Sequence, residues 1–534
     1  MNEIDARIGR VVAVSGSQLV CLLDKHEMGD PAMPYDVQTG AVVKTNTADS
    51  TVFSIVRGIS IPVPAENGNG EEICVAELDL VGEIVRRPDA SEEKFQRGVS
   101  VFPKLGMPVY SSTPQDLQQV LACRDVAVAR IGSVFQDRSL PANVRVNDLL
   151  GKHFAVLGTT GSGKSCAVTV ILKAILRESK RGRILLLDPH NEYSQAFGPT
   201  AHVLDPAANL DLPHWLFNFE ELVEIVLGTE SEDRAAQAII LAEAIMAARK
   251  RFLGDKKLSH PLTIDTPMPY RMANVIEYID QAQGNLSRRE SLTNYARLLN
   301  RLNTLYNDSR FAFMFGRGTR DNMTEILCGL FRVPVADKPV TIVNLAGVPS
   351  EVLNVVVSVL CRLAFDFAMW TEREFPVLVV CEEAHRYAPR NSSMGFEPTK
   401  RALTRIAKEG RKYGVSLCIV SQRPSDMAET VLAECNSMFA MRMTNQSDQD
   451  MVRAAICEVP SGLLEFLPSL RTGEAIASGE GTPIPCRITF DSLPSDELPR
   501  SETAVFTGTS NANAQVNEFV RIAVERWRSR QKAA

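Results

Sequence analysis

The chain has 534 residues, of which 45% are hydrophobic and 23% are charged, and its formal net charge is −6. This composition is typical of a globular protein, and the length predicts about three or four domains. The negative net charge argues against a module that covers nucleic acid with one basic face, although a ring can keep a basic lining inside an acidic exterior.

The sequence predicts neither a membrane span nor a metal–cysteine site. It has no run of about 18 apolar residues, and its first ten residues, MNEIDARIGR, lack the basic-then-apolar pattern of a secretory signal. The eleven cysteines are scattered singly, with no C-x-x-C pair. We therefore expect free thiols in a reducing cytoplasm, rather than zinc ligands or disulfides.

Residues 1–145 are typical of a small β-barrel or sandwich. Short β-branched runs such as RIGRVVAVSG, VFSIVRGISI and DVAVARIGSV are separated by Gly, Pro and Asn clusters, which is the pattern of an all-β unit. PAENGNGEE is expected to be an exposed loop. QDRSLPANVRVNDLLG is expected to join this unit to the part that follows.

Compact apolar runs from about residue 150 predict parallel strands buried on both faces. These runs are HFAVLG, RILLLD, VTIVNLA, VLVVCEE and VSLCIVSQ. Helical patterns between them complete an α/β core, which we place at 146–214 and 336–500. Between 215 and 335 the strand signal fades and helical periodicity predicts an insertion. The tail, 501–534, reads as an amphipathic helix that packs on its own domain or on a neighbouring subunit.

The octet from Gly158 to Ser165, GTTGSGKS, fits the pattern G-x-x-x-x-G-K-[ST]. An apolar strand enters this turn and a helix leaves it, so backbone N–H groups and the positive helix end would surround phosphate groups. Lys164 is expected to reach the β- and γ-phosphates of a nucleoside triphosphate, and Ser165 to bind Mg²⁺. The predicted nucleotide contacts are Gly158, Thr159, Thr160, Gly161, Ser162, Gly163, Lys164, Ser165 and Cys166.

PVLVVCEEAH predicts a buried strand that ends in two acids, Glu382 and Glu383. The usual Walker B pattern has Asp before Glu, so Glu382 departs from it, but a longer carboxylate can still hold a Mg²⁺-bound water. Glu383 is expected to orient and deprotonate the attacking water. Gln422, which ends VSLCIVSQ, is the candidate sensor of the γ-phosphate. The alternative for Ser421 and Gln422 is a turn-forming polar pair before Pro424.

The stretch TRIAKEGRKYGV supplies the candidate arginine finger. Cations near the C-terminus of a helix often only complement its dipole, but an exposed arginine can enter the site of the next subunit. Arg411 is the favoured residue and Arg405 the second. Asp188, His190 and Glu192 in LLLDPHNEY read either as switch residues or as ordinary polar residues at a strand end.

In this order the motifs resemble the HerA family, in the HerA/FtsK branch of ring-forming P-loop ATPases. The resemblance spans most of the chain and rests on IGSVFQDRSLPANVRVNDLLGKHFAVLGTTGSGKS, LLLDPHNEY, VVCEEAHRYAP and EGRKYGVSLCIVSQRPSDM. It implies an α/β, RecA-like core with an N-terminal HAS-type barrel, and a homo-hexamer that moves along double-stranded DNA by hydrolysing ATP with Mg²⁺. The matched positions are Lys164, Ser165, Glu382, Glu383, Gln422 and Arg411.

The resemblance also implies a partner for the ring. Family members work with a nuclease, NurA, in DNA-end processing, and bacterial relatives of this length resemble proteins paired with a sirtuin-like NADase or a nuclease in phage defence. A DNA translocase and an ATP-regulated scaffold for a toxic effector therefore both remain open. A GTPase is disfavoured because the chain has no [NT]-K-x-D motif. Arg386 and Arg390 are candidate DNA contacts, with simple surface solvation as the alternative for each.

Overall fold

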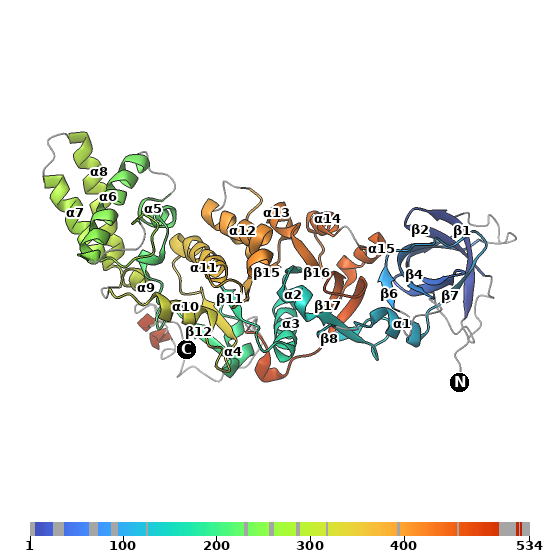
Figure 1. Cartoon of the computed structure of the whole chain (residues 1–534). Helices are drawn as coiled ribbons and strands as arrows, with labels where there is room; N and C mark the ends of the chain where they lie inside the picture. Colours follow the sequence, from blue (N-terminus) through green and yellow to red (C-terminus); the bar gives the residue numbers. More distant parts are fainter. Residues whose placement is uncertain are drawn as a thin grey trace. The chain divides into compact units, whose positions relative to one another are not determined.

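A computed structural model shows two compact units, and Figure 1 traces the chain through them. The first comprises Met1–Lys180 and Ser416–Pro494, and the second comprises Arg181–Val415 and Ser495–Ala534. The described residues are 6–24, 37–62, 73–86, 94–123, 126–228, 233–255, 261–284, 289–316, 319–391, 396–456, 459–500, 520–522 and 524–525. PAENGNGEE lies outside them, as does most of the tail, whose described residues are helical.

The first unit begins with a closed β-barrel. Its strands pair in the order β2-β1-β7-β3-β4-β5-β6, and a further pairing of β2 with β5 closes the ring. The strands are β1 (Arg7–Ser15), β2 (Gln18–Leu23), β3 (Val42–Asn46), β4 (Ser50–Ser60), β5 (Val75–Val85), β6 (Phe95–Arg97) and β7 (Pro108–Ser111), followed by helix α1 (Pro114–Leu121). Val11, Leu19 and Val56 are among the buried side chains that fill the barrel. The predicted small barrel is confirmed.

A mixed sheet forms the rest of the first unit, in the order β15-β10-β16-β17-β18-β8-β9. The strands are β8 (Val128–Val134), β9 (Pro141–Arg145), β10 (His153–Leu157), β15 (Val415–Ser421), β16 (Cys435–Met441), β17 (Glu474–Gly479) and β18 (Cys486–Phe490). β10 is parallel to β15 and β16, as predicted for the core. The helices of this part of the first unit are α2 (Val146–Leu150), α3 (Lys164–Glu178), α13 (Glu429–Leu432), α14 (Gln446–Ala455) and α15 (Ser461–Leu464).

One prediction about the barrel is wrong. The run DVAVARIGSV was expected to be a barrel strand, but its strand, β8, pairs with β18 and β9 in the core sheet. A Cβ at Gly132 would lie 2.0 Å from the backbone oxygen of Thr489, so this glycine allows the close approach of β18. Alternating burial shows that a strand has one buried face, but it does not show which sheet supplies the partner strands.

The second unit holds a parallel sheet in the order β12-β13-β11-β14. The strands are β11 (Ile184–Asp188), β12 (Ala201–Leu204), β13 (Val340–Asn344) and β14 (Val377–Cys381). All five residues of β11, β13 and β14 are buried, as the continuous apolar runs predicted. Helices α4 (Tyr193–Phe197), α11 (Ser350–Trp370) and α12 (Glu397–Tyr413) accompany this sheet. The α/β fold predicted from alternating strands and helices is confirmed.

A group of helices lies between β12 and β13, where the insertion was predicted. They are α5 (Phe219–Leu227), α6 (Arg234–Leu253), α7 (Met272–Gly284), α8 (Arg289–Asn307), α9 (Ala312–Phe315) and α10 (Met323–Phe331). Figure 1 shows α6, α7 and α8 side by side, and α7 packs against both of the others. The buried ring of His214 lies against Phe315 and Tyr270 at the base of this group.

Among the described residues, one helix is long and apolar enough to cross a membrane. It is Glu351–Trp370 within α11, with a mean hydropathy of 1.9, and 72% of the window is buried inside the protein. The sequence did not predict this helix as a membrane span because Arg362 and Asp366 interrupt its apolar run. Arg362 forms an ion pair with the buried Glu221 of α5, so α11 has the contacts of a core helix.

Candidate nucleotide site

The glycine-rich turn follows β10 and opens α3, as predicted. Gly161 (φ 76°) and Gly163 (φ 95°) have left-handed backbone conformations, which strain a residue with a side chain. A Cβ at Gly158 would lie 2.8 Å from Ser162 Oγ. Gly163 is the N-cap of α3, so the unpaired N–H groups and positive end of the helix face the turn. The turn therefore fits the phosphate groups of a nucleotide.

Lys164 and Thr159 shape the inside of this turn. The ammonium of Lys164 donates to the backbone oxygen of Thr159 at 3.1 Å, so the lysine folds back over the turn. The N–H and the hydroxyl of Thr159 both donate to the backbone oxygen of Arg442, at 2.9 and 3.0 Å. Arg442 follows β16, and the sequence alone did not indicate that this strand would hold the P-loop.

Gln422 lies beside the P-loop within the first unit. Its side-chain oxygen accepts a hydrogen bond from the Thr160 hydroxyl at 2.6 Å. The preceding Ser421 accepts from the N–H of Arg423 through its hydroxyl at 3.1 Å, so Ser421 shapes the turn before Pro424. Gln422 as a sensor of the γ-phosphate stays a prediction. A polar cavity of about 440 Å³ adjoins Thr160 and Gln422, with Thr159, Arg423, Ser425, Asp426, Asn445 and Asp448 in its wall.

The acidic pair of the second unit begins directly after β14. Glu382 is buried, and one of its carboxylate oxygens accepts a hydrogen bond from the hydroxyl of Tyr193. Burial and the Glu382 charge raise the pKa of Tyr193 well above its usual value, so the phenol stays protonated and donates. Glu382 therefore has a fixed orientation. Tyr193 was missed in the sequence, although it ends the motif LLLDPHNEY.

Glu383 has a strained backbone, with φ at 52°. This left-handed conformation is uncommon for a residue with a side chain and often marks a functional position. His385 Nδ1 approaches Glu383 Oε2 to 3.2 Å, but the contact is not a hydrogen bond, and this buried oxygen has no hydrogen-bond partner among the described residues. A carboxylate oxygen in this state is suited to accept a proton from a bound water.

The carboxylate of Asp188 is used by its own turn. It accepts hydrogen bonds from the N–H groups of His190, Glu192 and Tyr193 at 3.0 to 3.2 Å. Burial raises the pKa of Asp188, and these hydrogen bonds act in the opposite direction. Asp188 thus shapes the turn after β11 and places Tyr193 against Glu382.

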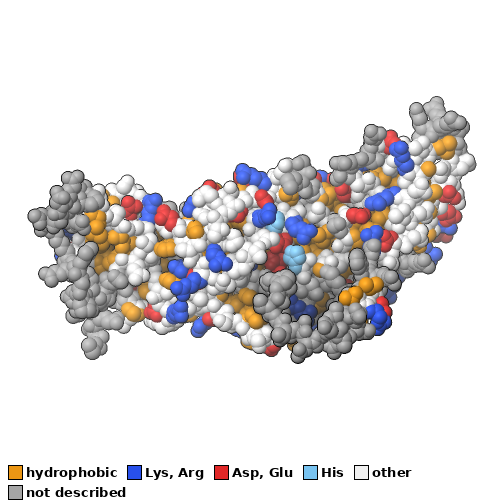
Figure 2. Space-filling model, turned by 180° about the vertical axis from the view of Figure 1, so that it is seen from behind, with side chains coloured by type: hydrophobic (Ala, Val, Ile, Leu, Met, Phe, Trp, Pro, Cys, Tyr) orange, Lys and Arg blue, Asp and Glu red, His pale blue; other side chains and the backbone are white. Residues whose placement is uncertain are grey.

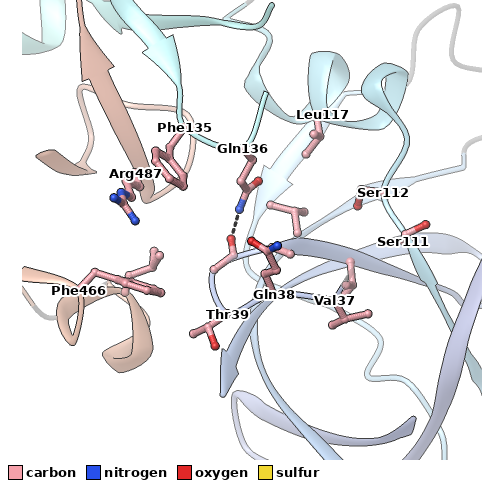
Figure 3. A pocket seen from close by; sticks show the side chains of 15 residues that line it. Val37, Gln38, Thr39, Ser111, Ser112, Leu117, Phe135, Gln136, Phe466 and Arg487 are labelled. Carbon is pink, nitrogen blue, oxygen red and sulfur yellow. Dashed lines mark hydrogen bonds between the residues drawn. The ribbon is translucent and has the colours of Figure 1, made fainter. Parts of the chain in front are cut away.

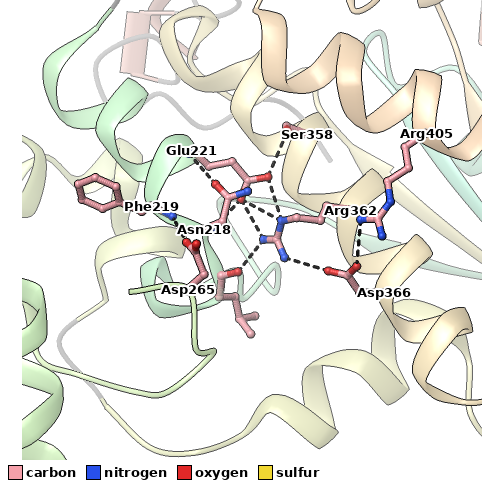
Figure 4. A network of polar contacts seen from close by, with 9 residues as sticks. Asn218, Phe219, Glu221, Asp265, Ser358, Arg362, Asp366 and Arg405 are labelled. Carbon is pink, nitrogen blue, oxygen red and sulfur yellow. Dashed lines mark hydrogen bonds and ion pairs between the residues drawn. The ribbon is translucent and has the colours of Figure 1, made fainter. Parts of the chain in front are cut away.

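The two candidate arginines of α12 differ in their surroundings. The guanidinium of Arg405 lies 3.7 Å from Asp366, 3.9 Å from Glu409 and 4.0 Å from the ring centre of Phe365. Figure 4 shows Arg405 reaching Asp366, which also approaches Arg362. These contacts within one subunit argue against Arg405 as a finger. Arg411 lies exposed in the last turn of α12 and, among the described residues, forms no ion pair.

The charges of the described surface are mixed in sign. On the face in Figure 2, lysine and arginine side chains alternate with acidic ones, and its described residues form no continuous basic band. Arg386 and Arg390 are both exposed, as candidate DNA contacts must be. Among the described residues there is also no group of three or more His, Cys, Asp and Glu side chains that could hold a metal ion by themselves.

Comparisons with known proteins point to one family. Residues 129–364 match the family model described as the central domain of helicase HerA. The DNA double-strand break repair helicase HerA of Pyrococcus furiosus is 26% identical over 463 residues, which cover 79% of this chain and 78% of that one. HerA of Sulfolobus acidocaldarius is 27% identical over 402 residues, which cover 73% and 74%.

A solved structure of VirB4 from Thermoanaerobacter pseudethanolicus aligns with 70% of this chain and 99% of its own, at 15% identity and a TM-score of 0.49. The region that matches the family model contains the P-loop and the Asp188 turn, and the two relatives extend the match over most of the chain. The chain is thus similar to HerA helicases over most of its length, in the region that carries the motifs of an ATPase.

Proposed function

We propose that this ATPase assembles into a homo-hexameric ring that moves along double-stranded DNA. The observation that carries the proposal is the P-loop turn, with its left-handed glycines and with Gln422 hydrogen-bonded to Thr160. The name of the Pyrococcus furiosus relative, a DNA double-strand break repair helicase, supports DNA as the track. The resemblance adds a partner, either a NurA-like nuclease or a sirtuin-like or nuclease effector, and the scattered cysteines add a location in the cytoplasm.

In this proposal, each residue of the site has a separate role in the hydrolysis of ATP. Lys164 and the N–H groups of the turn bind the phosphates, and Gln422 contacts the γ-phosphate and the attacking water. Glu383 takes the proton of that water. Ser165 and Glu382 would hold Mg²⁺, which when bound neutralises phosphate charge. The Tyr193 hydrogen bond supports this role of Glu382 because it fixes the carboxylate without neutralising it.

The position of Arg411 supports a ring. Gly414, three residues later, accepts a hydrogen bond from the N–H of Val377, so α12 ends beside the first residue of β14. Glu383 lies beyond the opposite end of β14, and six residues of extended chain span roughly 20 Å. Arg411 therefore cannot reach Glu383 of its own subunit. A role for this arginine in hydrolysis requires a second copy of the chain.

The test is hydrolysis of ATP with and without linear duplex DNA. We expect stimulation that does not depend on sequence and falls steeply between about 50 mM and about 200 mM salt, because phosphate contacts release counterions. Lys164→Ala is the inactive control, and the mass of the purified particle gives the number of subunits. Hydrolysis that ignores duplex DNA would reject the translocase and favour the ATP-regulated scaffold.

A further inference from the structure

In the first unit, the segment of residues 462–474 touches both the barrel and the phosphate-binding turn. At its start, a Cβ at Gly462 would lie 2.6 Å from the backbone oxygen of Arg57 in β4, so helix α15 is in direct contact with the barrel. The next residues include Leu463 and Phe466, which line a cavity between the barrel and the sheet. The segment ends at β17.

The far end of this segment holds the P-loop. The hydroxyl of Thr472 donates to the backbone oxygen of Gly161 at 3.2 Å. The N–H of Gly473 donates to the backbone oxygen of Ser162 at 3.0 Å. Because these two carbonyl groups are held from outside, the N–H groups of the turn are kept in the orientation that phosphate binding needs.

Glu474 accepts hydrogen bonds that hold the C-terminal end of this segment in place. It is 3% exposed, and one of its oxygens accepts from the N–H of Arg471 at 2.9 Å and from Arg487 Nη2 at 2.7 Å. Burial acts to raise the pKa of Glu474, but these hydrogen bonds outweigh it and the pKa lies below its ordinary value. The ionised carboxylate thus binds both the turn Arg471–Gly473 and a cation on β18.

Arg487 connects Glu474 to the junction with the barrel. Its guanidinium lies 3.6 Å from the ring centre of Phe135 and 5.7 Å from that of Phe466. Figure 3 shows these three side chains together at one side of a cavity of about 480 Å³, with Val37 of the barrel unit at the other. Glu474 is therefore in contact with a residue whose position depends on how the junction is packed.

We propose that Glu474 and Arg487 are positioning residues for ATP binding, which set the phosphate-binding turn from the barrel junction. The inference rests on the proposed role of the P-loop as the nucleotide site. Without the carboxylate, the N–H of Arg471 loses a charged acceptor and the largely covered guanidinium of Arg487 loses its partner. The turn Arg471–Gly473 then relaxes, and the carbonyl groups of Gly161 and Ser162 lose their fixed donors.

The test is the affinity of the full-length chain for a fluorescent ATP analogue, together with KM and kcat for ATP. We expect Glu474→Gln to raise Kd and KM about tenfold while kcat stays within about twofold, because hydrogen bonds to a charged group are replaced by weaker ones. Thr472 is exposed, and Thr472→Val keeps nearly the same shape but removes the hydrogen bond to Gly161, so it should raise Kd about threefold. Phe466→Leu, which changes the packing of the junction beside Arg487 but keeps Glu474 and Thr472, should also raise Kd.

Glu480→Gln is the matched control. Glu480, which follows β17, also forms an ion pair, with Lys152, and accepts a hydrogen bond from Asn436. If Glu474→Gln and Thr472→Val bind the analogue as tightly as Glu480→Gln, the positioning role is rejected. If Phe466→Leu alone leaves Kd unchanged, the link to the barrel junction is rejected. Unchanged binding by Lys164→Ala would instead reject the P-loop as the nucleotide site, which keeps the two failures distinct.

Discussion

The hydroxyl of Thr160 donates a hydrogen bond to the side-chain oxygen of Gln422 over 2.6 Å, across 262 positions of the sequence. This contact orients the candidate sensor from within the P-loop itself. Gln422 also lines the polar cavity beside the turn, and the nitrogen of its amide group can donate hydrogen bonds to a γ-phosphate or an attacking water.

The hydrogen bond between Thr160 and Gln422 predicts that its loss slows the hydrolysis of ATP and does not weaken ATP binding. Thr160→Val should lower kcat about fivefold with little change in KM, because one hydrogen bond is worth about 1 kcal/mol. Thr160→Ser keeps the donor and should retain most of the rate. In a double-variant comparison by phosphate release, Thr160→Val should add nothing to Gln422→Ala. Additive losses would mean that the two side chains act separately.

Substitutions at Lys164 and Glu383 should separate binding from chemistry. Lys164→Ala should abolish hydrolysis and weaken ATP binding, because the lysine contacts the phosphates. Glu383→Gln should bind ATP normally but hydrolyse it at least about a hundredfold more slowly, because the general base is lost. Titration with a fluorescent ATP analogue and phosphate release measure the two effects. A Glu383→Gln variant that kept most of its turnover would show that another group takes the proton.

The P-loop was predictable from the sequence, whereas the contacts around it were not. Phosphate binding needs Gly158 to Ser165 to be contiguous, so the chemistry is visible in one short stretch. The partners of this turn, Arg442 just after β16 and Thr472 just before β17, are distant in the sequence and carry no motif. Tyr193 and Glu382 are likewise 189 positions apart, and only the fold brings them together.

The arginines illustrate the same limit. Arg405 and Arg411 lie on one helix and look alike in the sequence, so only their neighbours tell them apart. Asp366 and Phe365 of α11 hold Arg405, whereas Arg411 follows Gly410, where a Cβ would lie 2.5 Å from the backbone oxygen of Val415. This glycine lets α12 end tightly against the start of β15, with Arg411 exposed.

Mixing experiments should show that Arg411 acts between subunits. Arg411→Ala should form rings and hydrolyse ATP on the order of 10³-fold more slowly, as loss of an arginine finger does in other ATPases and GTPases. Mixing it with Lys164→Ala should restore part of the rate, because some interfaces then join an intact P-loop to an intact arginine. Lys412→Ala, the neighbouring exposed cation, is the control with near-normal hydrolysis. No recovery in mixed rings of confirmed mass would contradict a finger supplied by the next subunit.

The ion pair between Glu221 and Arg362 should stabilise the second unit. Glu221 is 1% exposed, and Arg362 Nη2 approaches it to 2.9 Å, with Ser358 as a further donor. Glu221→Ala should lower the free energy of unfolding by about 3–5 kcal/mol, because it leaves a buried charge without its partner. Glu220→Ala removes only an exposed pair with Arg401 and should cost less than about 1 kcal/mol. Urea unfolding measures both, and equal losses would show that burial of the pair is unimportant.

His214 predicts how the stability of the second unit depends on pH. Its Nδ1 lies 3.1 Å from the backbone oxygen of Met314 and its Nε2 lies 3.1 Å from that of Tyr270. A neutral imidazole can donate to only one of them. Burial nevertheless lowers the pKa of His214 from 6.5 to about 4, although the two carbonyl groups act to raise it. The folded protein therefore holds a neutral ring at neutral pH.

Because the folded pKa is depressed, the unfolded chain binds more protons between pH 6.5 and about 4. The stability from the neutral ring is thus complete above pH 6.5 and is lost as the pH falls towards 4, to a total of about 3 kcal/mol. His214→Phe keeps a ring to stack on Phe315 but cannot titrate. Urea midpoints measured from pH 7.5 down to pH 4.5 should fall more steeply for the natural chain than for this variant, since the other titrating groups are shared. Parallel curves would mean that folding leaves the pKa of His214 unchanged, and a shallower fall for the natural chain would mean that the fold protonates the ring so that it donates to both carbonyl groups.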